Sequence, residues 1–247
     1  MSSIENAALL ALVAIVPLVV LTLTSFVKLS VVLSLVRNAI GAPDAPSGLV
    51  VTGLSLVLTF FVMAPVAVKM VEAAAAPAPT QPAPKQGAAP SPTPTAPAQQ
   101  VPAPQQPAPH SVDAALRVLV PAQYQPQLAA AERAVEPLRA FLLKHSRDVD
   151  RDTFSSLARK LGNETNGDEL WVLAPAFITT ELREAFAIAI LIFIPFLVID
   201  LVVALSLASL GLQTTSPQTV SLPFKLVLFV AIDGWRLLID SLLRGYV

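Results

Sequence analysis

Four long apolar blocks alternate with polar segments along the 247-residue chain. They extend over about Ala7–Val36, Gly48–Val71, Ala185–Leu212 and Leu222–Leu243. A helix that crosses a membrane needs about 20 mostly apolar residues, and each block is at least that long. The pattern predicts an all-α protein built from multipass membrane-associated helical hairpins. Helices partly buried inside a protein assembly are an equally good interpretation.

Prolines interrupt the apolar blocks. Pro17, Pro65 and Pro195 lie inside blocks, and Pro223 opens the fourth. A proline removes a backbone donor and bends a helix, and in a membrane the freed carbonyl needs another partner. The blocks are therefore predicted to form kinked helices that pack against other subunits. The alternative is that prolines are simply commoner in membrane helices.

The segment between the second and third blocks changes character twice. Residues 73–110 are rich in proline and alanine, lack large apolar side chains, and predict a disordered insert or polyproline-like tether. From Ser111 an amphipathic pattern returns, with apolar residues three or four positions apart. The predicted domains are a first hairpin (1–72), the insert (73–110), a small helical extracytoplasmic region (111–172) and a second hairpin (173–247).

Two helical faces are predicted in the small helical region. The first helix presents Leu128, Ala131, Val135, Leu138 and Leu142 on one side. In the second, Asp150 or Asp152 can cap the helix, Gly162 can end it, and three apolar side chains share one face: Phe154, Leu157 and Leu161.

Composition narrows the function classes. Apolar residues make up 54% and charged residues 13% of the chain, whereas soluble domains have about 25% charged residues. The net charge of −1 gives no basic surface for nucleic acid. Absence of cysteine excludes disulfides and thiolate chemistry. Neither His110 nor His145 has a second ligand at metal spacing, so both are predicted to be solvated, with no metal, no cofactor and no enzymatic activity.

Charges inside the apolar blocks are the candidate functional residues. A charge in a lipid-facing helix costs about 2.5–3.5 kcal/mol, so such residues usually face protein or water. Lys28, Asp200 and Asp233 are predicted to be buried functional charges. Lys28 and Arg37 place the first connection in the cytoplasm and the region after the second block in the periplasm. Two arginines near the C-terminus, Arg236 and Arg244, favour the opposite orientation.

Several segments together resemble one family. They are LTSFVKLSVVLSLVRNAIGAPDAPSG, LTFFVMAPV, PLRAFLLKHS, LAPAFITTELREAF, IFIPFLVIDLVVA and SLPFKLVLFVAIDGW. Jointly they are similar to the export-gate R subunit of type III secretion systems, the SctR/FliP family. The resemblance covers nearly the whole chain except the insert and the extreme N-terminus.

The resemblance implies a multipass inner-membrane protein of bacteria. Such subunits assemble, as a pentamer in most cases, with the S and T subunits into a gate through which unfolded substrates pass. Partners would include the lipid membrane and other export-apparatus subunits. The resemblance also implies a salt bridge between Glu181 of one subunit and Lys225 of the next. The alternative for these two charges is that each reaches a membrane surface by itself.

One departure from the family concerns the passage. After Gly211 the family often carries a run of methionines that forms a deformable constriction. Here the loop is Gly211, Leu212, Gln213, Thr214 and Thr215, which predicts a stiffer and more polar ring at the same place.

Other function classes remain open at this level. A small-solute transporter would show repeated halves, which are not visible here. A membrane-anchored scaffold would need a fuller binding domain than 111–172. The flagellar counterpart of the gate is the nearest alternative to an injectisome of a virulence system. The missing methionine run and the absence of a signal-like N-terminus favour the injectisome.

Overall fold

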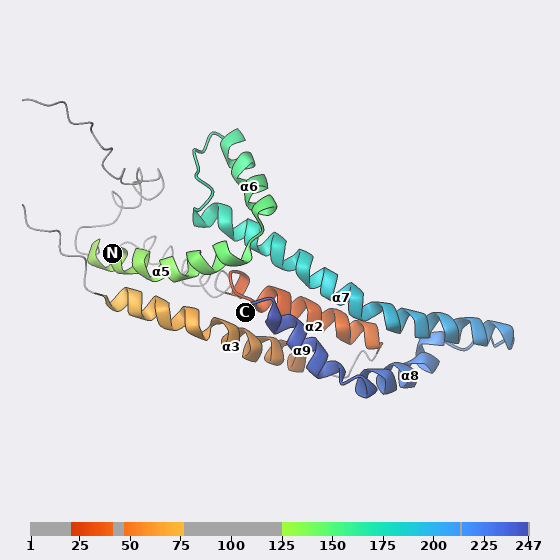
Figure 1. Cartoon of the computed structure of the whole chain (residues 1–247). Coiled ribbons are helices and arrows are strands. Elements are labelled where there is room, and N and C mark those ends of the chain that lie inside the picture. Colours follow the sequence, from red (N-terminus) through yellow and green to blue (C-terminus); the bar gives the residue numbers. More distant parts are fainter. Residues whose placement is uncertain (1–20, 42–46, 77–124, 213, 247) are drawn as a thin grey trace, which may run out of the picture. The chain divides into compact units, whose positions relative to one another are not determined.

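The computed structural model describes residues 21–41, 47–76, 125–212 and 214–246 (Figure 1). Within these ranges the regular structure is entirely helical, which confirms the predicted all-α class. Predictions for Pro17, His110, Gln213 and most of the insert fall outside the described residues. The helices are α2 (Phe26–Ile40), α3 (Gly48–Ala75), α5 (Gln125–His145), α6 (Asp148–Lys160), α7 (Leu170–Ser209), α8 (Pro217–Ala231) and α9 (Gly234–Arg244).

The chain divides into two compact units. The larger unit comprises residues 1–68 and 137–247, and the smaller comprises residues 69–136. This division differs from the four domains predicted by composition, and those boundaries stay predictions. In the smaller unit, the end of α3 and the start of α5 are joined by a hydrogen bond from the Arg133 guanidinium to the carbonyl of Ala76.

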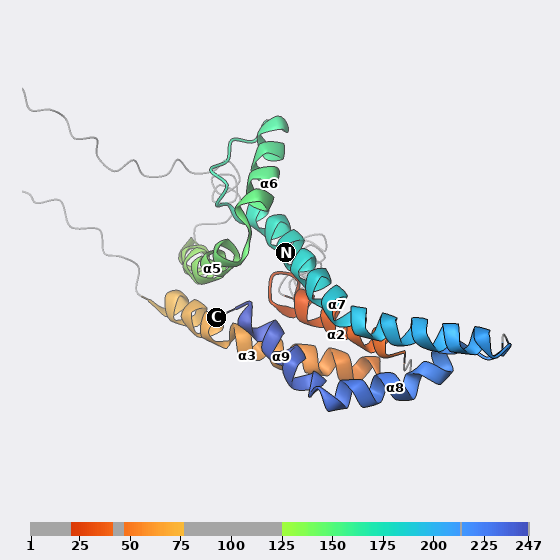
Figure 2. The ribbon, with the colours of Figure 1, turned by 45° about the vertical axis from the view of Figure 1, so that its right-hand side comes forward.

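The larger unit is organised around α7. This helix packs against α2, α6 and α8, and α8 packs in turn against α9. In both views, Figures 1 and 2 show α2 alongside the middle of α7. The face of α2 that meets these neighbours is built from residues at three- and four-residue spacing: Leu29, Val32, Leu33, Val36 and Ile40. These side chains are the centre of the main hydrophobic core.

Two of the described helices, α3 and α7, are long and apolar enough to cross a membrane. Helix α7 has 40 residues, because the third apolar block continues without a break from the LAPAFITTELREAF segment. Helices α3, α7 and α8 include Pro65, Pro195 and Pro223 within their bounds. The predicted kinks at these prolines stay predictions.

The fourth apolar block is not one long helix, contrary to the prediction that it could form a membrane span. It divides into α8 and α9 at Ile232 and Asp233. Asp233 has a left-handed backbone (φ 53°), a conformation that stops a helix. A Cβ on Gly234 would lie 2.3 Å from the ring of Phe229, so only glycine allows the close approach of the two helices.

The predicted faces of α5 and α6 have different outcomes. On α5, Leu142 is fully buried and Leu138 packs against the second hydrophobic cluster, as expected. The predicted face of α6 is wrong, because Leu157 and Leu161 are exposed and the buried side chains are Asp150, Ser155 and Ala158. The polar contacts of Asp150 with α7 decide which face turns inward.

The connection between α6 and α7 is held by Glu169. Its carboxylate accepts hydrogen bonds from the Thr165 hydroxyl and from the backbone N–H groups of Asn166 and Gly167. Burial alone would raise the pKa of Glu169, but these hydrogen bonds outweigh burial and lower the pKa. The start of α7 is therefore fixed by an ionised carboxylate.

Candidate functional site

The first buried charge cluster joins α2 to α7, and we call it the Lys28 site. The Lys28 ammonium lies 2.7 Å from Glu184 Oε2 and 3.5 Å from Glu181 Oε1. The side chains of Lys28 and Glu181 are each 1% exposed, whereas that of Glu184 is 44% exposed. One cation is thus shared by two carboxylates one helical turn apart on α7.

Tyr246, from the tail after α9, completes the Lys28 site. Its hydroxyl donates a hydrogen bond to Glu181 Oε2. The Lys28 ammonium lies 4.2 Å from the centre of its ring, a cation–π contact. The ring also stacks on Phe141 at 6.2 Å. Next to it, a Cβ on Gly245 would come within 3.0 Å of the Lys28 ammonium, so glycine leaves room for the buried cation.

The phenol of Tyr246 is a permanent hydrogen-bond donor. Burial and the negative charge of Glu181 both raise its pKa far above the ordinary value of 10.0. It is therefore protonated throughout the physiological range. A neutral hydroxyl, and not a cation, is the second partner of Glu181.

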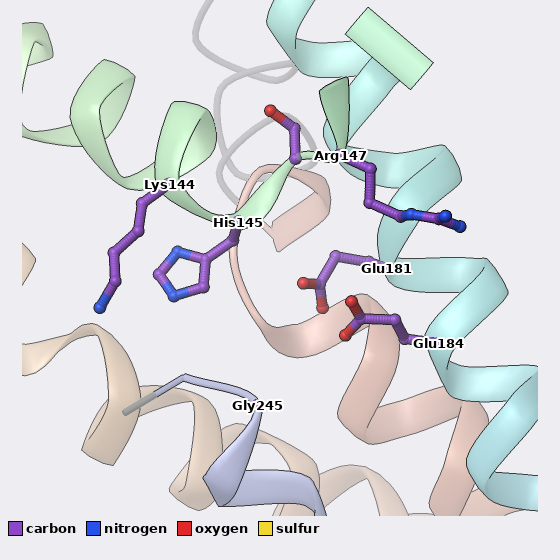
Figure 3. A pocket seen from close by; sticks show the side chains of 7 residues that line it. Lys144, His145, Arg147, Glu181, Glu184 and Gly245 are labelled. Atoms are coloured by element: carbon purple, nitrogen blue, oxygen red, sulfur yellow. The ribbon is translucent and has the colours of Figure 1, made fainter. Parts of the chain in front are cut away.

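A polar cavity of about 140 Å³ opens beside the Lys28 site. Figure 3 shows Glu181 and Glu184 projecting from α7 on the side where His145 leaves the end of α5, with Gly245 of the C-terminal tail nearby. The rest of the lining comes from Lys144, Ser146 and Arg147.

His145 is packed into this region, so the prediction that it is solvated is wrong. Its ring lies 4.4 Å from that of Phe141 and 5.3 Å from that of Tyr246, and Nδ1 is 2.9 Å from the carbonyl of Phe141. Burial lowers the pKa of His145 below 6.5. The hydrogen bond to Phe141 opposes this shift, and the charges of Lys144 and Lys28 add to it. Near neutral pH the ring is uncharged.

The second cluster joins α7, α8 and the end of α2, and we call it the Lys225 site. The Lys225 ammonium lies 2.6 Å from Asp200 Oδ2 and donates to the carbonyl of Ala39 at 3.1 Å. Ser221 donates its hydroxyl to the other oxygen of Asp200. The carbonyl of Ala39 is one of the unpaired acceptors at the C-terminus of α2, where a cation is favourable.

A third cluster fastens α6 to α7. The Thr180 hydroxyl donates to Asp150 Oδ2 at 2.8 Å and accepts from the backbone N–H of Arg147 at 3.1 Å. Arg183 approaches Asp150 at 3.6 Å from the exposed side. Three clusters along one helix therefore set the positions of α2, α6, α8 and the C-terminal tail.

These clusters are suited to holding helices together, and the described residues offer no group of three or more histidine, aspartate or glutamate side chains arranged for a metal ion. Replacing one partner of a buried ion pair costs about 3–5 kcal/mol, because the other charge stays buried without compensation. Loss of any one of the central charges should therefore disturb the packing of α7.

The structure places the predicted site residues as follows. Lys28 is buried and Asp200 is partly buried, each in an ion pair. Asp233 is exposed in the single chain, 4.0 Å from Arg236, so its burial stays a prediction for an assembly. Glu181 and Lys225 each have another partner within the chain. A contact between them in two subunits is not tested by one chain.

The predicted constriction loop lies in the turn between α7 and α8. Gly211 has a positive φ of 75°, Leu212 is 48% exposed, and Thr214 and Thr215 are exposed. Gln213 is outside the described residues. The described residues Leu212, Thr214 and Thr215 are thus exposed in the single chain, and the role of the loop as a constriction stays a prediction.

Known proteins resemble this chain over most of its length. The FliP family matches residues 9–96 and 105–242. The flagellar biosynthetic protein FliP of Pectobacterium carotovorum subsp. carotovorum is 38% identical over 247 residues, which cover 99% of this chain and 79% of that protein. The hypersensitivity response secretion protein HrcR of Ralstonia nicotianae is 33% identical over 254 residues, with 100% of both chains covered.

Other relatives are longer than this chain. A flagellar biosynthetic protein FliP of Buchnera aphidicola subsp. Baizongia pistaciae is 36% identical, and the match covers 56% of that protein. With family and relatives in agreement, the chain belongs to the FliP family, which confirms the predicted SctR/FliP resemblance. It is therefore a subunit of a type III secretion or flagellar export apparatus.

Reasoning from sequence missed three residues of these clusters, Thr180, Ser221 and Tyr246, and gave Asp150 only the role of a possible helix cap. Their partners are far away along the chain, so no local spacing reveals them. Glu184 does carry a signal, because it stands one turn after Glu181 at the edge of an apolar block.

Proposed function

We propose that this protein is a structural, non-enzymatic subunit of the type III secretion export gate. Copies of it, as a pentamer, would combine with the S and T subunits to form the pore through which unfolded substrates cross the bacterial inner membrane. The region between the two hairpins would lie in the periplasm. Family membership supports the export apparatus, and the surface of the α7–α8 hairpin supports the gate.

The observation that carries this proposal is an apolar surface that the chain leaves uncovered. In the most apolar stretch of α7 only 11% of residues are buried. Exposed large side chains occur around the helix and on α8: Ile190, Leu191, Ile194, Leu197, Val198, Leu201, Val202, Leu205, Phe224, Val227 and Val230. A surface of this kind needs lipid or neighbouring subunits to cover it.

The charge clusters support a packed assembly. Glu181 and Asp200 of α7 each pair with a lysine inside the chain, at the Lys28 and Lys225 sites, which supports leaving the apolar face of the hairpin for other subunits or lipid. A substrate-lining loop at its tip, Gly211–Thr215, would then be repeated around the gate axis. Copies of the same turn can form a ring because the hairpins have identical lengths.

The proposed Glu181–Lys225 salt bridge between subunits needs an exchange of partners. Glu181 would leave Tyr246, and Lys225 would leave Asp200 or share it. Introduced cysteines can test this contact without background crosslinking, because the chain has no native cysteine. Two separately tagged copies, one with Glu181→Cys and one with Lys225→Cys, should crosslink in the assembled complex. Absence of a crosslinked tag pair would reject the contact.

The mass of the detergent-extracted complex tests the gate. A gate subunit should run in one large complex together with two other small hydrophobic proteins. A monomer or small homo-oligomer without those proteins would contradict the proposal.

The flagellar export gate is the second candidate, since the relatives include flagellar FliP proteins as well as HrcR. Expression in a strain that lacks its own flagellar subunit, and in one that lacks its injectisome subunit, separates the two. Restored secretion in the injectisome strain and not in the flagellar strain is the expected outcome. Restored motility alone would assign the chain to the flagellum.

A further inference from the structure

An apolar groove lies between the middle of α7 and the break that separates α8 from α9. It has a volume of about 270 Å³, and side chains of all three helices line it. The rings of Phe196 and Phe229, which are almost fully buried and lie 6.3 Å apart, form its floor. Leu191 and Leu237 also line it and are 72% and 56% exposed. The groove is therefore open at the surface of the single chain.

A charged hollow of about 400 Å³ adjoins this groove along α9. Ile232 and Leu237 line both spaces, so the groove and the hollow are continuous. The rest of the hollow is lined by two acidic and two basic side chains, whose formal charges cancel: Asp233, Asp240, Arg236 and Arg244.

The four charges of the hollow are available to a ligand. Arg236 lies 4.0 Å from Asp233 and Arg244 lies 2.7 Å from Asp240, and all four side chains are more than half exposed. Exposed ion pairs of this kind contribute little to stability. Each charge can therefore exchange its partner for a group of opposite sign on a bound molecule.

An apolar groove that continues into a charge-balanced hollow fits an amphiphile with a zwitterionic headgroup. A lipid acyl chain gains free energy with every methylene group that it buries in the groove. A phosphate matches the guanidinium of Arg236, because arginine binds phosphate oxygens through two parallel N–H donors. The aspartates match a second, positive group. A purely anionic headgroup would leave them without a partner.

The same features fit a lipid better than a helix of a second copy. A helix laid over the groove would also cover the hollow and would have to compensate four charges. The most exposed apolar face of the chain, on α3, offers such side chains as Phe60, Phe61 and Val68, which cannot do so. Trp235, 42% exposed at the start of α9, is a residue type enriched where hydrocarbon meets headgroups.

We propose that the groove and the hollow together bind one zwitterionic glycerophospholipid. One acyl chain lies in the groove against Phe196 and Phe229. The phosphate pairs with Arg236, and an ammonium group pairs with Asp233 and Asp240. The lipid fills the space beside the break between α8 and α9 and joins both helices to α7. The site belongs to the single chain and does not depend on the gate.

Native mass spectrometry of the full chain tests the groove. The chain is coexpressed with the other export-apparatus proteins, extracted in detergent, and incubated with equal amounts of phosphatidylethanolamine and phosphatidylglycerol that carry the same acyl chains. Leu191→Gln places an amide in the groove and should lower retention of phosphatidylethanolamine roughly tenfold. Leu201→Gln is the matched control, because Leu201 is also exposed on α7 but does not line the groove. It should leave retention unchanged.

The same competition tests the hollow. The wild type should prefer phosphatidylethanolamine roughly fivefold, the scale of an exposed ion pair. The double variant Asp233→Asn, Asp240→Asn leaves the two arginines unbalanced and should prefer phosphatidylglycerol. Asparagine also accepts the left-handed backbone at position 233, so the helix break is kept. Asp152→Asn, at an exposed position on α6, is the control and should keep the wild-type preference.

Four results would overturn the lipid site. They are equal retention of the two lipids by the wild type, an unchanged preference in the double variant, equal loss of lipid in Leu191→Gln and Leu201→Gln, and lipid on the free chain but not on the assembled complex. The last result would assign the groove to a neighbouring subunit. A chain that forms no large complex would instead reject the gate, while lipid binding to the free chain still decides the site.

Discussion

The ammonium of Lys28 lies 2.7 Å from the carboxylate of Glu184, although 156 positions separate the two residues in the sequence. Glu181, on the adjacent turn of α7, also pairs with this ammonium. This contact fixes α2 against α7 near the corner where α5, α6 and the C-terminal tail meet. It makes the long apolar helix α7 the element on which the larger unit depends.

Lys28→Met should destabilise the free chain strongly. It leaves Glu181 buried with an uncompensated charge, and the loss should be about 3–5 kcal/mol. Thermal unfolding in detergent measures this loss. Lys160→Met, at an exposed position on α6, is the control and should change Tm little. Equal Tm values for the two variants would show that the buried cation does not hold α2 to α7.

Thr180→Val tests the fastening of α6 to α7. Valine keeps the shape of threonine but cannot pair with Asp150 or accept from the N–H of Arg147. The buried carboxylate of Asp150 loses a partner, which should cost about 1–3 kcal/mol, and the partly buried N–H of Arg147 loses its acceptor as well. Thr179→Val is the matched control, because that hydroxyl donates only to Pro175 of its own helix. Faster hydrogen exchange in α6 is expected for Thr180→Val alone.

The pH dependence of stability should contain a contribution from His145. Its pKa in the folded chain is below the ordinary 6.5, so the unfolded chain binds more protons in this range. That contribution is present above about pH 6.5 and is lost as the pH falls through the lower, folded pKa. Urea unfolding between pH 7.5 and 5, values chosen to bracket 6.5, should show stability decreasing toward acid.

His145→Gln is the control for that titration. It should flatten the curve between neutral pH and the folded pKa of His145, while any change caused by Glu169 would occur near or below 4.5, its ordinary pKa. An identical pH profile in the wild type and in His145→Gln would show that His145 does not contribute to the pH dependence of stability.

Much of the helical architecture could be predicted from the sequence. The spacing of Leu29, Val32 and Val36 identifies the buried face of α2, because tertiary packing follows the helical period. The break after α8 could also have been found. The dipeptide Asp233–Gly234 is a turn signal, although it lies within an apolar block.

The charge clusters could not be predicted in the same way. Their partners come from helices far apart in the sequence, as with Tyr246 and Glu181, which are 65 positions apart. The inward face of α6 depends on the Asp150–Thr180 hydrogen bond, which overrides the apolar pattern of Leu157 and Leu161. Long-range polar contacts of this kind leave no periodicity in the sequence.

The gate proposal requires the α7–α8 turn to line the passage through which substrates move. In the cysteine-free chain, Gln213→Cys is coexpressed with the other apparatus proteins and a substrate stalled in transit that carries its own cysteine. Leu161→Cys, on the exposed residue after α6, is the control. A disulfide between Gln213→Cys and the substrate is expected, and none is expected from Leu161→Cys. A cysteine at position 213 that reacts freely with bulk reagent and never captures substrate would contradict the gate proposal.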